Sequence, residues 1–236
     1  MLAAYESAPR KDRVIVALDL DRQAALDIAK QLQGRAAWMK VGMTLYYAEG
    51  PAIVEILKLL GYKVFLDLKF HDIPHQVAGA AASAVEAGAD MITMHAVGGA
   101  PMMQAAQSAV DESGSDADTL AITVLTSMDD AVLAQTGVAR PMADQVRALA
   151  ESAQDAGLSG VVASPQEAAM LRELLGPDAL IVTPGVRPVG ADAGDQSRVA
   201  TPREAFDAGA SHIVVGRPIT QADDPAAAFD AIVAQL

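Results

Sequence analysis

Four charged residues at the ends of three apolar segments are the first candidates for chemistry. Asp67 and Lys69 lie at the end of one segment, and Lys40 and Asp19 lie at the ends of two others. If these segments are strands, Asp67 and Lys69 share a face, because side chains alternate along a strand. Charges on an inward face need partners, since an unpaired buried charge is costly. The four residues therefore predict an alternating array of acids and bases, typical of an active site, with a structural ion-pair network as the alternative.

Two stretches near the C-terminus favour phosphate binding. Arg187 follows one predicted strand, and Gly216 and Arg217 follow the next. Glycine allows backbone N–H groups to approach an anion closely, and arginine adds charge-assisted hydrogen bonds. Residues 189–200, which include Gln196, are polar and glycine-rich, so we expect this segment to close over a ligand. An ordinary surface loop with exposed arginines is the alternative.

Metal and thiol chemistry have little support in the sequence. His71 and His75 are four residues apart and could share a helix face as metal ligands. The chain has only 4 histidines, and no third ligand is evident, so we expect no bound metal. Because the chain has no cysteine, disulfides and thiol catalysis are excluded.

The four charged residues can form one site only if the fold brings the ends of their strands together. Along the chain, apolar segments alternate with helix-like segments. The predicted strands are Val14–Asp19, Ala37–Val41, Lys63–Leu68, Met91–His95, Leu120–Leu125, Gly160–Ala163, Leu180–Thr183 and Ser211–Val215. The predicted helices are Gln23–Gln33, Pro51–Leu60, Val77–Ala87, Pro101–Glu112, Pro141–Ala156, Pro165–Leu175, Pro202–Ala208 and Pro225–Leu236. This alternation argues for a parallel sheet, and eight units favour a closed (β/α)8 TIM barrel, in which catalytic residues lie at the C-terminal strand ends.

An open, doubly wound sheet is the competing α/β architecture. It is disfavoured because the first predicted strand is not followed by the G-x-G fingerprint of dinucleotide-binding folds. Acid-Ala-Gly triplets at 86–88, 155–157 and 207–209 suit helix ends, where glycine adopts a left-handed conformation. His212 begins the last predicted strand, at the barrel end opposite the catalytic one.

Composition bounds the class of protein. The 236 residues are 52% hydrophobic, and we expect one barrel domain over residues 1–236, with residues 1–12 as an N-terminal extension. A net charge of −13 disfavours nucleic-acid binding. No apolar stretch approaches the roughly 18 residues of a membrane helix, and residues 1–12 lack the apolar region of a signal peptide. We therefore expect a cytoplasmic protein without membrane or nucleic-acid partners.

Six motifs that together span nearly the whole chain resemble those of the bacterial-type orotidine 5′-monophosphate decarboxylase family, in the family's order. They are Val16–Asp19, Lys40–Gly42, Asp67–Pro74, Val124–Ser127, Thr183–Arg187 and Val215–Ile219. The Asp-x-Lys-x-x-Asp core of the third motif is highly specific in this longer context. The resemblance implies a cofactor-free lyase that converts orotidine 5′-monophosphate to uridine 5′-monophosphate in pyrimidine synthesis.

The resemblance also implies roles for the charged residues. Lys69 resembles the lysine that protonates C6 of the pyrimidine as carbon dioxide leaves, and Asp67 resembles the carboxylate set against the substrate carboxylate. Lys40 and Asp19 resemble the groups that hold the ribose hydroxyls and complete the charged array. Asp72 resembles the aspartate that reaches the neighbouring subunit's site, which implies a homodimer.

Further substrate contacts follow from the same resemblance. They are Thr126 and Ser127 at the pyrimidine, Ile73 and Gln76 next to Asp72, and Arg187, Gln196, Gly216 and Arg217 at the phosphate and lid. The chain departs from the family at one point, because the family often continues Asp-Ile-Pro with Asn-Thr where this chain has His75 and Gln76. The threonine contact is therefore missing, although the amide of Gln76 can still form a hydrogen bond.

Two other functions compete with the decarboxylase. Mg²⁺-dependent sugar-phosphate lyases that resemble 3-keto-L-gulonate 6-phosphate decarboxylase share the barrel and the Asp-x-Lys-x-x-Asp core. Their second strand typically ends in Glu-x-Gly, whereas this chain has Lys40 there, and a second lysine disfavours a divalent cation. A non-catalytic binder of phosphate ligands is the other alternative, since fold alone does not exclude it.

Overall fold

Eight parallel strands close into one barrel in the computed structural model, which describes residues 8–188 and 200–236. The strands are β1 (Val14–Ala17), β2 (Trp38–Gly42), β3 (Lys63–Phe70), β4 (Met91–His95), β5 (Asp118–Ile122), β6 (Gly160–Val162), β7 (Leu180–Thr183) and β8 (His212–Val215). Each strand pairs with the next along the chain, and β8 pairs with β1. The predicted (β/α)8 barrel is therefore confirmed.

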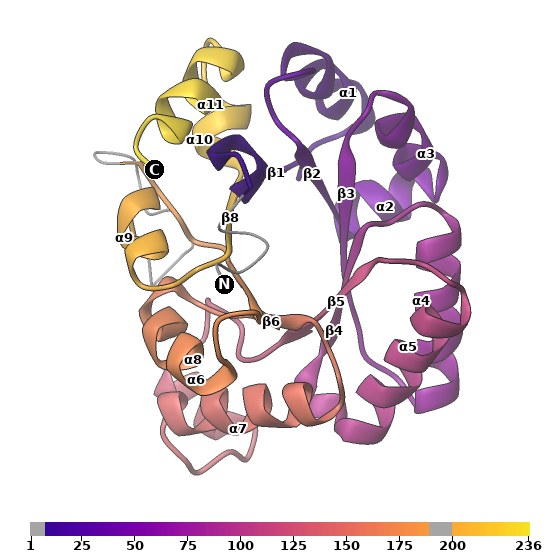
Figure 1. The fold of residues 1–236 in the computed structure, drawn as a ribbon, viewed down its shortest axis with the longest axis vertical. Helices are drawn as coiled ribbons and strands as arrows, with labels where there is room; N and C mark the ends of the chain where they lie inside the picture. Colours follow the sequence, from indigo (N-terminus) through magenta and orange to yellow (C-terminus); the bar gives the residue numbers. More distant parts are fainter. Residues whose placement is uncertain (1–7, 189–199) are drawn as a thin grey trace.

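Helices surround the strands as an outer layer (Figure 1). The α-helices are α1 (Arg22–Gln31), α2 (Met43–Glu49), α3 (Ala52–Leu59), α4 (Pro74–Glu86), α5 (Ala100–Glu112), α6 (Asp130–Gln135), α7 (Met142–Asp155), α8 (Ala168–Leu175), α9 (Pro202–Asp207), α10 (Arg217–Thr220) and α11 (Pro225–Val233). Short 3-10 helices are η2 (Arg10–Arg13), η3 (Ala96–Gly98) and η4 (Pro165–Glu167). No helix in the described part of the chain is both long and apolar enough to cross a membrane.

Alternation along the strands divides the apolar core into two parts. Inside the barrel, Ile15, Phe65 and Leu120 belong to one buried cluster. Val14 and Val16 flank Ile15 and belong to a larger cluster that includes buried helix residues. Both faces of each strand are covered, which explains why the strands read as continuous apolar runs rather than as alternating patterns.

Local signals in the sequence mark where the helices begin and end. The Asp21 side chain accepts a hydrogen bond from the Ala24 N–H at the start of α1. The three acid-Ala-Gly triplets end α4, α7 and α9, and Gly88, Gly157 and Gly209 have φ angles of 97°, 82° and 99°. The prediction that these glycines terminate helices is confirmed.

The structure differs from the predicted elements in several places. The helices α2, α6 and α10 were not predicted, because they have only 7, 6 and 4 residues. Strand β5 covers Asp118–Ile122 rather than Leu120–Leu125, so Thr126 lies four residues beyond the strand. The 3-10 helix η2 covers the end of the predicted N-terminal extension, and Arg13, directly after that extension, donates hydrogen bonds to the backbone oxygens of Ser211 and Ala210.

His212 lies at the N-terminal end of β8, as the sequence predicts. It is 7% exposed, and its ring meets the Trp38 ring edge-on, with 6.0 Å between centroids. Burial lowers the pKa of His212 to about 4, and the charges of Arg13 and Lys63 act in the same direction. His212 is therefore an uncharged core residue near neutral pH, at the barrel end opposite the charged residues described below.

Candidate active site

A cavity of about 450 Å³ opens at the C-terminal ends of the strands. It is lined by charged residues at the ends of β1, β2 and β3 and by residues that follow β7 and β8, and the two sets adjoin because β8 pairs with β1. Of the predicted site residues, the lining includes Asp19, Lys40, Asp67, Lys69, Thr126, Arg187, Gly216 and Arg217. One concave site therefore combines the predicted charged array with the predicted phosphate region.

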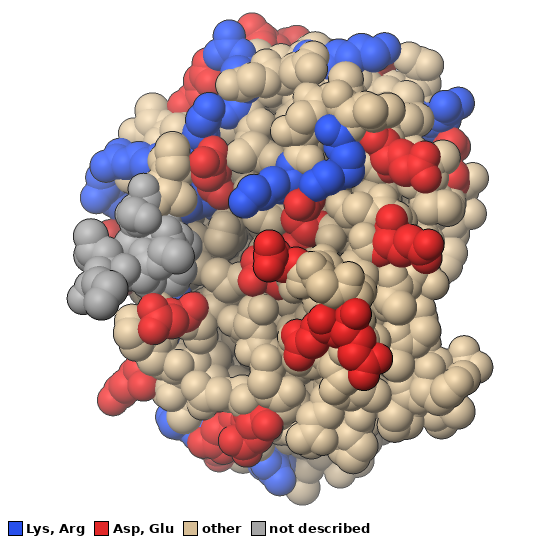
Figure 2. Space-filling model, turned by 45° about the vertical axis from the view of Figure 1, so that its right-hand side comes forward, with Lys and Arg blue, Asp and Glu red and all other residues tan. Residues whose placement is uncertain are grey.

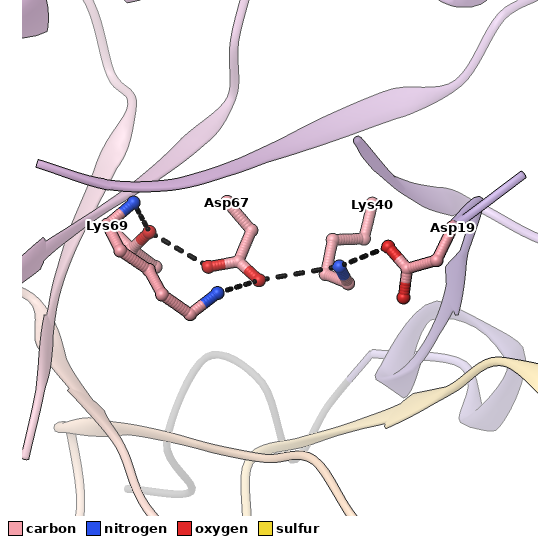
Figure 3. A network of polar contacts seen from close by, with 5 residues as sticks. Asp19, Lys40, Asp67 and Lys69 are labelled. Atoms are coloured by element: carbon pink, nitrogen blue, oxygen red, sulfur yellow. Dashed lines mark hydrogen bonds and ion pairs between the residues drawn. The ribbon is translucent and has the colours of Figure 1, made fainter. Parts of the chain in front are cut away.

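The four charged side chains form a continuous chain of ion pairs (Figure 3). Lys69 Nζ lies 2.8 Å from Asp67 Oδ2, and Lys40 Nζ lies 3.4 Å from the same oxygen. Lys40 Nζ also donates a hydrogen bond to Asp19 Oδ1 at 3.0 Å. The order is therefore Lys69, Asp67, Lys40, Asp19, with acids and bases alternating as the sequence predicts.

The side chains at the centre of the array are more deeply buried than those at its two ends. The side chains of Lys40 and Asp67 are 10% and 11% exposed, whereas those of Lys69 and Asp19 are 25% and 60% exposed. Charges removed from water interact strongly, so the central pair is the electrostatic core of the site. The two outer groups are the ones most accessible to a ligand.

The neighbouring charges determine the protonation states of Asp67 and Lys40. Burial alone would raise the pKa of Asp67, but the Lys40 and Lys69 ammonium groups hold it below its usual value, with help from hydrogen bonds donated by Lys69 and Thr93. Burial alone would lower the pKa of Lys40, but Asp67 and Asp19 hold it above its usual value. Both groups are therefore charged at neutral pH, and neither can act as a proton shuttle there.

The part of the cavity beyond the ends of β7 and β8 carries the predicted phosphate residues. Arg187 and Arg217 line it together with Gly216, and residues 184, 185, 220 and 221 add to the lining. Thr220 and Gln221 are polar contacts that sequence reasoning missed. They were missed because α10, which places them one turn after Arg217, is a single short turn that the sequence did not reveal. Basic side chains gather mainly in the upper half of the face in Figure 2, although the chain is acidic overall.

Other predicted site residues do not line this cavity. Asp72, Ile73 and Gln76 are exposed beyond the end of β3, and Ser127 is absent from the lining although its neighbour Thr126 is present. Gln196 and the predicted lid lie outside the described residues, apart from Ala200, which bridges to Val186. In residues 8–188 and 200–236, no group of three or more histidine and acidic side chains is arranged to hold a metal ion.

Thr93, on β4, is a further polar residue of the site that the sequence did not reveal. It is fully buried, and its hydroxyl donates a hydrogen bond of 2.9 Å to Asp67 Oδ1. A threonine in the middle of an apolar strand gives no pattern that distinguishes it from core packing. Its role is visible only from the distance to Asp67.

Comparison with known proteins matches this geometry to a family. The family model described as "Orotidine 5'-phosphate decarboxylase / HUMPS family" matches residues 12–232. The chain belongs to this family. Its relatives include proteins named orotidine 5′-phosphate decarboxylase from Moorella thermoacetica, 49% identical over 96% of this chain and 92% of the relative, and from Halorhodospira halophila, 49% identical over 98% of each.

Two solved structures that are similar to this chain have the same overall fold. The crystal structure of orotidine 5′-phosphate decarboxylase from Lactobacillus acidophilus is 41% identical and has a TM-score of 0.85, covering 95% of this chain and 98% of that one. An uncharacterized conserved protein from Geobacillus kaustophilus is 37% identical, with a TM-score of 0.83 over 94% of this chain and 99% of that one. The family resemblance found in the sequence is therefore confirmed.

Gly42 provides a test of how tightly the array is built. A β-carbon at this position would lie 2.7 Å from Asp19 Oδ1 and 3.1 Å from Lys40 Nζ, although the backbone angles of −91° and 178° suit alanine. We expect Gly42→Ala to displace the exposed Asp19 carboxylate from Lys40, and to change the free energy of unfolding by less than about 1 kcal/mol because Asp19 can rotate into solvent. A crystal structure and urea unfolding measure the two effects.

The matched control is Gly79→Ala, because a β-carbon at Gly79 meets nothing within 4 Å. It should leave the Asp19–Lys40 contact unchanged. A Gly42→Ala crystal structure that keeps this contact at its original length would show that the array tolerates crowding and that Gly42 is not required by it.

Proposed function

We propose that the chain is an orotidine 5′-phosphate decarboxylase that acts without a cofactor, in the cytoplasm, in pyrimidine nucleotide synthesis. The observation that carries the proposal is the buried Asp67 carboxylate held between two ammonium groups at the barrel mouth. The names of relatives that are about half identical over nearly the whole chain support the same reaction.

Lys69 supplies the stabilising charge and the proton. Cleavage of the C6–carboxylate bond releases carbon dioxide and leaves the electron pair on C6, where the pyrimidine ring has no evident electron sink. An ammonium group already fixed beside C6 stabilises the developing carbanion without reorganisation. Lys69 Nζ then gives a proton to C6, so uridine 5′-monophosphate forms and the lysine is left neutral until it takes a proton from solvent.

Asp67 repels the substrate carboxylate, which leaves as carbon dioxide. Its low pKa keeps it ionised near neutral pH, so it would repel a substrate carboxylate placed against it. Repulsion of this kind raises the energy of the bound substrate and is relieved as neutral carbon dioxide forms. The Lys69 and Lys40 contacts hold Asp67 in place against this repulsion.

Binding groups surround this reacting centre. Lys40 and Asp19 would hold the ribose hydroxyls, because the exposed Asp19 carboxylate accepts hydrogen bonds and the Lys40 ammonium donates them. Thr126 and Ser127 would contact the pyrimidine, and Arg187, Gln196, Gly216 and Arg217 would bind the phosphate and close the site. Contacts remote from C6 supply binding energy that is used to reach the transition state.

The same array argues against the Mg²⁺-dependent sugar-phosphate lyases. Lys40 Nζ lies within 3.4 Å of both Asp19 and Asp67, so an ammonium group already occupies the space between the two carboxylates. A divalent cation prefers several oxygen ligands and would be repelled by this charge. A non-catalytic binder has no need for two lysines placed on one buried carboxylate.

The deciding experiment follows the loss of the orotate absorbance when purified protein is mixed with orotidine 5′-monophosphate in EDTA. We expect rapid turnover, because every charge in the proposed mechanism comes from the protein. Turnover only of a keto-sugar phosphate with added Mg²⁺ would assign the chain to the rival lyases. Binding of the nucleotide without turnover would leave a phosphate-ligand binder.

Lys69→Ala tests the proposed proton donor. Loss of the ammonium group should lower kcat by at least about a hundredfold to a thousandfold, the usual effect of removing one preorganised charge-stabilising donor. Binding of uridine 5′-monophosphate, measured by calorimetry, should persist because the phosphate contacts are intact. Lys58→Ala is the control, since Lys58 also forms an ion pair, with Asp90, but lies outside the cavity. Turnover close to that of the wild type would exclude Lys69 from this role.

We further propose that the chain forms a homodimer through the rim of the cavity. Met43, Ile73, Val97 and Leu125 follow the C-terminal ends of β2, β3, β4 and β5 and are 44%, 63%, 55% and 38% exposed. Apolar side chains exposed along one side of a rim are typical of an interface. Asp72, next to Ile73, would then reach the partner's site, together with Ile73 and Gln76.

Mixing two inactive variants tests this arrangement. We expect Lys69→Ala and Asp72→Asn each to lack most activity, and their mixture after subunit exchange to recover about a quarter of it, because a heterodimer contains one site with both native residues. Sedimentation of the wild type should give a dimer. A mixture no more active than its components, with heterodimers present, would place Asp72 in its own chain's site or in none.

A further inference from the structure

Strand β3 carries a bulge against β4 in the segment that contains Asp67 and Lys69. Leu66 pairs with Ile92 on β4, but the next pair joins Phe70 to Met94. Strand β3 therefore advances four residues while β4 advances two, and Asp67 and Lys69 lie in the stretch that does not pair with β4. Bulges of this kind redirect side chains next to active sites.

Lys69 has an unusual backbone conformation within the bulge. Its φ angle is 53°, and among residues 8–188 and 200–236 it is the only residue other than glycine with a positive φ. An L-residue in this region is disfavoured sterically and persists only where the surroundings hold it. The regular ladder cannot do so here, because β3 and β4 are out of register at this point.

Thr93 provides the missing contact. Its hydroxyl oxygen accepts a hydrogen bond from the Lys69 backbone N–H at 2.9 Å and donates one to Asp67 Oδ1 at 2.9 Å. The direction is fixed, because an ionised carboxylate only accepts and a backbone N–H only donates. This side chain of β4 thus takes the place of the ladder bond that the bulge removes.

The two oxygens of Asp67 consequently have different partners. Oδ1 accepts from Thr93, whereas Oδ2 faces both Lys69 Nζ and Lys40 Nζ. A carboxylate fixed at one oxygen cannot rotate freely about its bond to the β-carbon. The orientation that presents Oδ2 to both lysines is therefore set from β4.

We propose that Thr93 is a positioning residue of the decarboxylase site, whose hydroxyl fixes both the bulged backbone of Lys69 and the orientation of the Asp67 carboxylate. This inference rests on the proposed function, in which Lys69 and Asp67 act on the substrate. Thr93 itself is fully buried behind them and does not line the cavity.

The effect of the Thr93 hydroxyl can be tested by measuring the pKa of Asp67, whose charged neighbours are known. Lys40 faces Asp67 from β2, Lys69 from β3, and His95 from the end of β4. Burial lowers the pKa of His95, with the charges of His71 and Lys69 acting in the same direction, so it is neutral near pH 7. Removing the Thr93 hydroxyl leaves all of these groups in the chain, so a change in the Asp67 pKa reports the lost hydrogen bond and the reorientation that follows.

Two variants isolate the hydroxyl from the packing of the side chain. Thr93→Ser and Thr93→Ala both lack the γ-methyl group and differ only in the hydroxyl. Thr93→Val, which keeps the volume, replaces the alanine variant if that variant does not fold. Thr119→Ala is the control, because Thr119 is also fully buried and its hydroxyl bonds Gln107, but it lies near the N-terminal end of β5 and outside the cavity.

We expect kcat for orotidine 5′-monophosphate to fall about tenfold to a hundredfold in Thr93→Ala, the usual effect of losing a hydrogen bond to a charged group. KM should change little, because the phosphate contacts are untouched. Thr93→Ser should recover most of the lost kcat, and Thr119→Ala should keep the wild-type value. Equal kcat in the serine and alanine variants would overturn the proposal.

A measurement without substrate separates this inference from the proposed function. Titration of the Asp67 side-chain carbon by ¹³C NMR, assigned with Asp67→Asn, should show a higher pKa in Thr93→Ala than in Thr93→Ser, because the alanine variant lacks a donor to the ionised form. If the wild type does not decarboxylate the nucleotide, the proposed function fails and the titration still decides whether Thr93 holds Asp67. Equal Asp67 titration in the two variants would overturn the inference.

Discussion

The attraction between one buried carboxylate and two ammonium groups is the interaction on which the site depends. Burial disfavours the charged form of Asp67, and Lys40 and Lys69 outweigh that effect, while Asp67 and Asp19 do the same for Lys40. Removing Lys40 or Asp67, the two buried members, leaves an uncompensated charge in a region with little water, which is strongly destabilising. The array is therefore cooperative, and its geometry is fixed before a ligand arrives.

The barrel supplies the surroundings that this array needs. Closure of eight parallel strands places the ends of β1, β2 and β3 side by side, so residues far apart in the sequence become neighbours. Because β8 pairs with β1, the ends of β7 and β8 continue the same rim and bring Arg187, Gly216 and Arg217 to the same cavity. The acidic chain thus offers positive groups to an anion at this rim, against its overall charge.

Sequence reasoning identified the barrel and most of the array, because strand ends in a parallel barrel meet at one rim whatever the loops do. The sequence analysis assumed that side chains alternate regularly from Asp67 to Lys69. Strand β3 is instead bulged there, and Lys69 reaches the cavity with a positive φ angle. Thr93 was missed because its role depends on register between two strands, and Thr220 was missed because α10 is a single short turn. The predicted contacts of Asp72 depend on a second chain and remain predictions.

The balance of charge in the array has an evolutionary consequence. Two acids and two bases sum to zero, so the center has no excess charge to attract a metal ion. Replacing Lys40 by glutamate would leave two excess negative charges among oxygen ligands, a setting suited to a divalent cation. Lysine and glutamate codons differ by one base, so a single mutation separates a site that works with its own ammonium groups from one that could recruit a metal. The charge of residue 40 therefore decides which of these two kinds of site the rim of this barrel could hold.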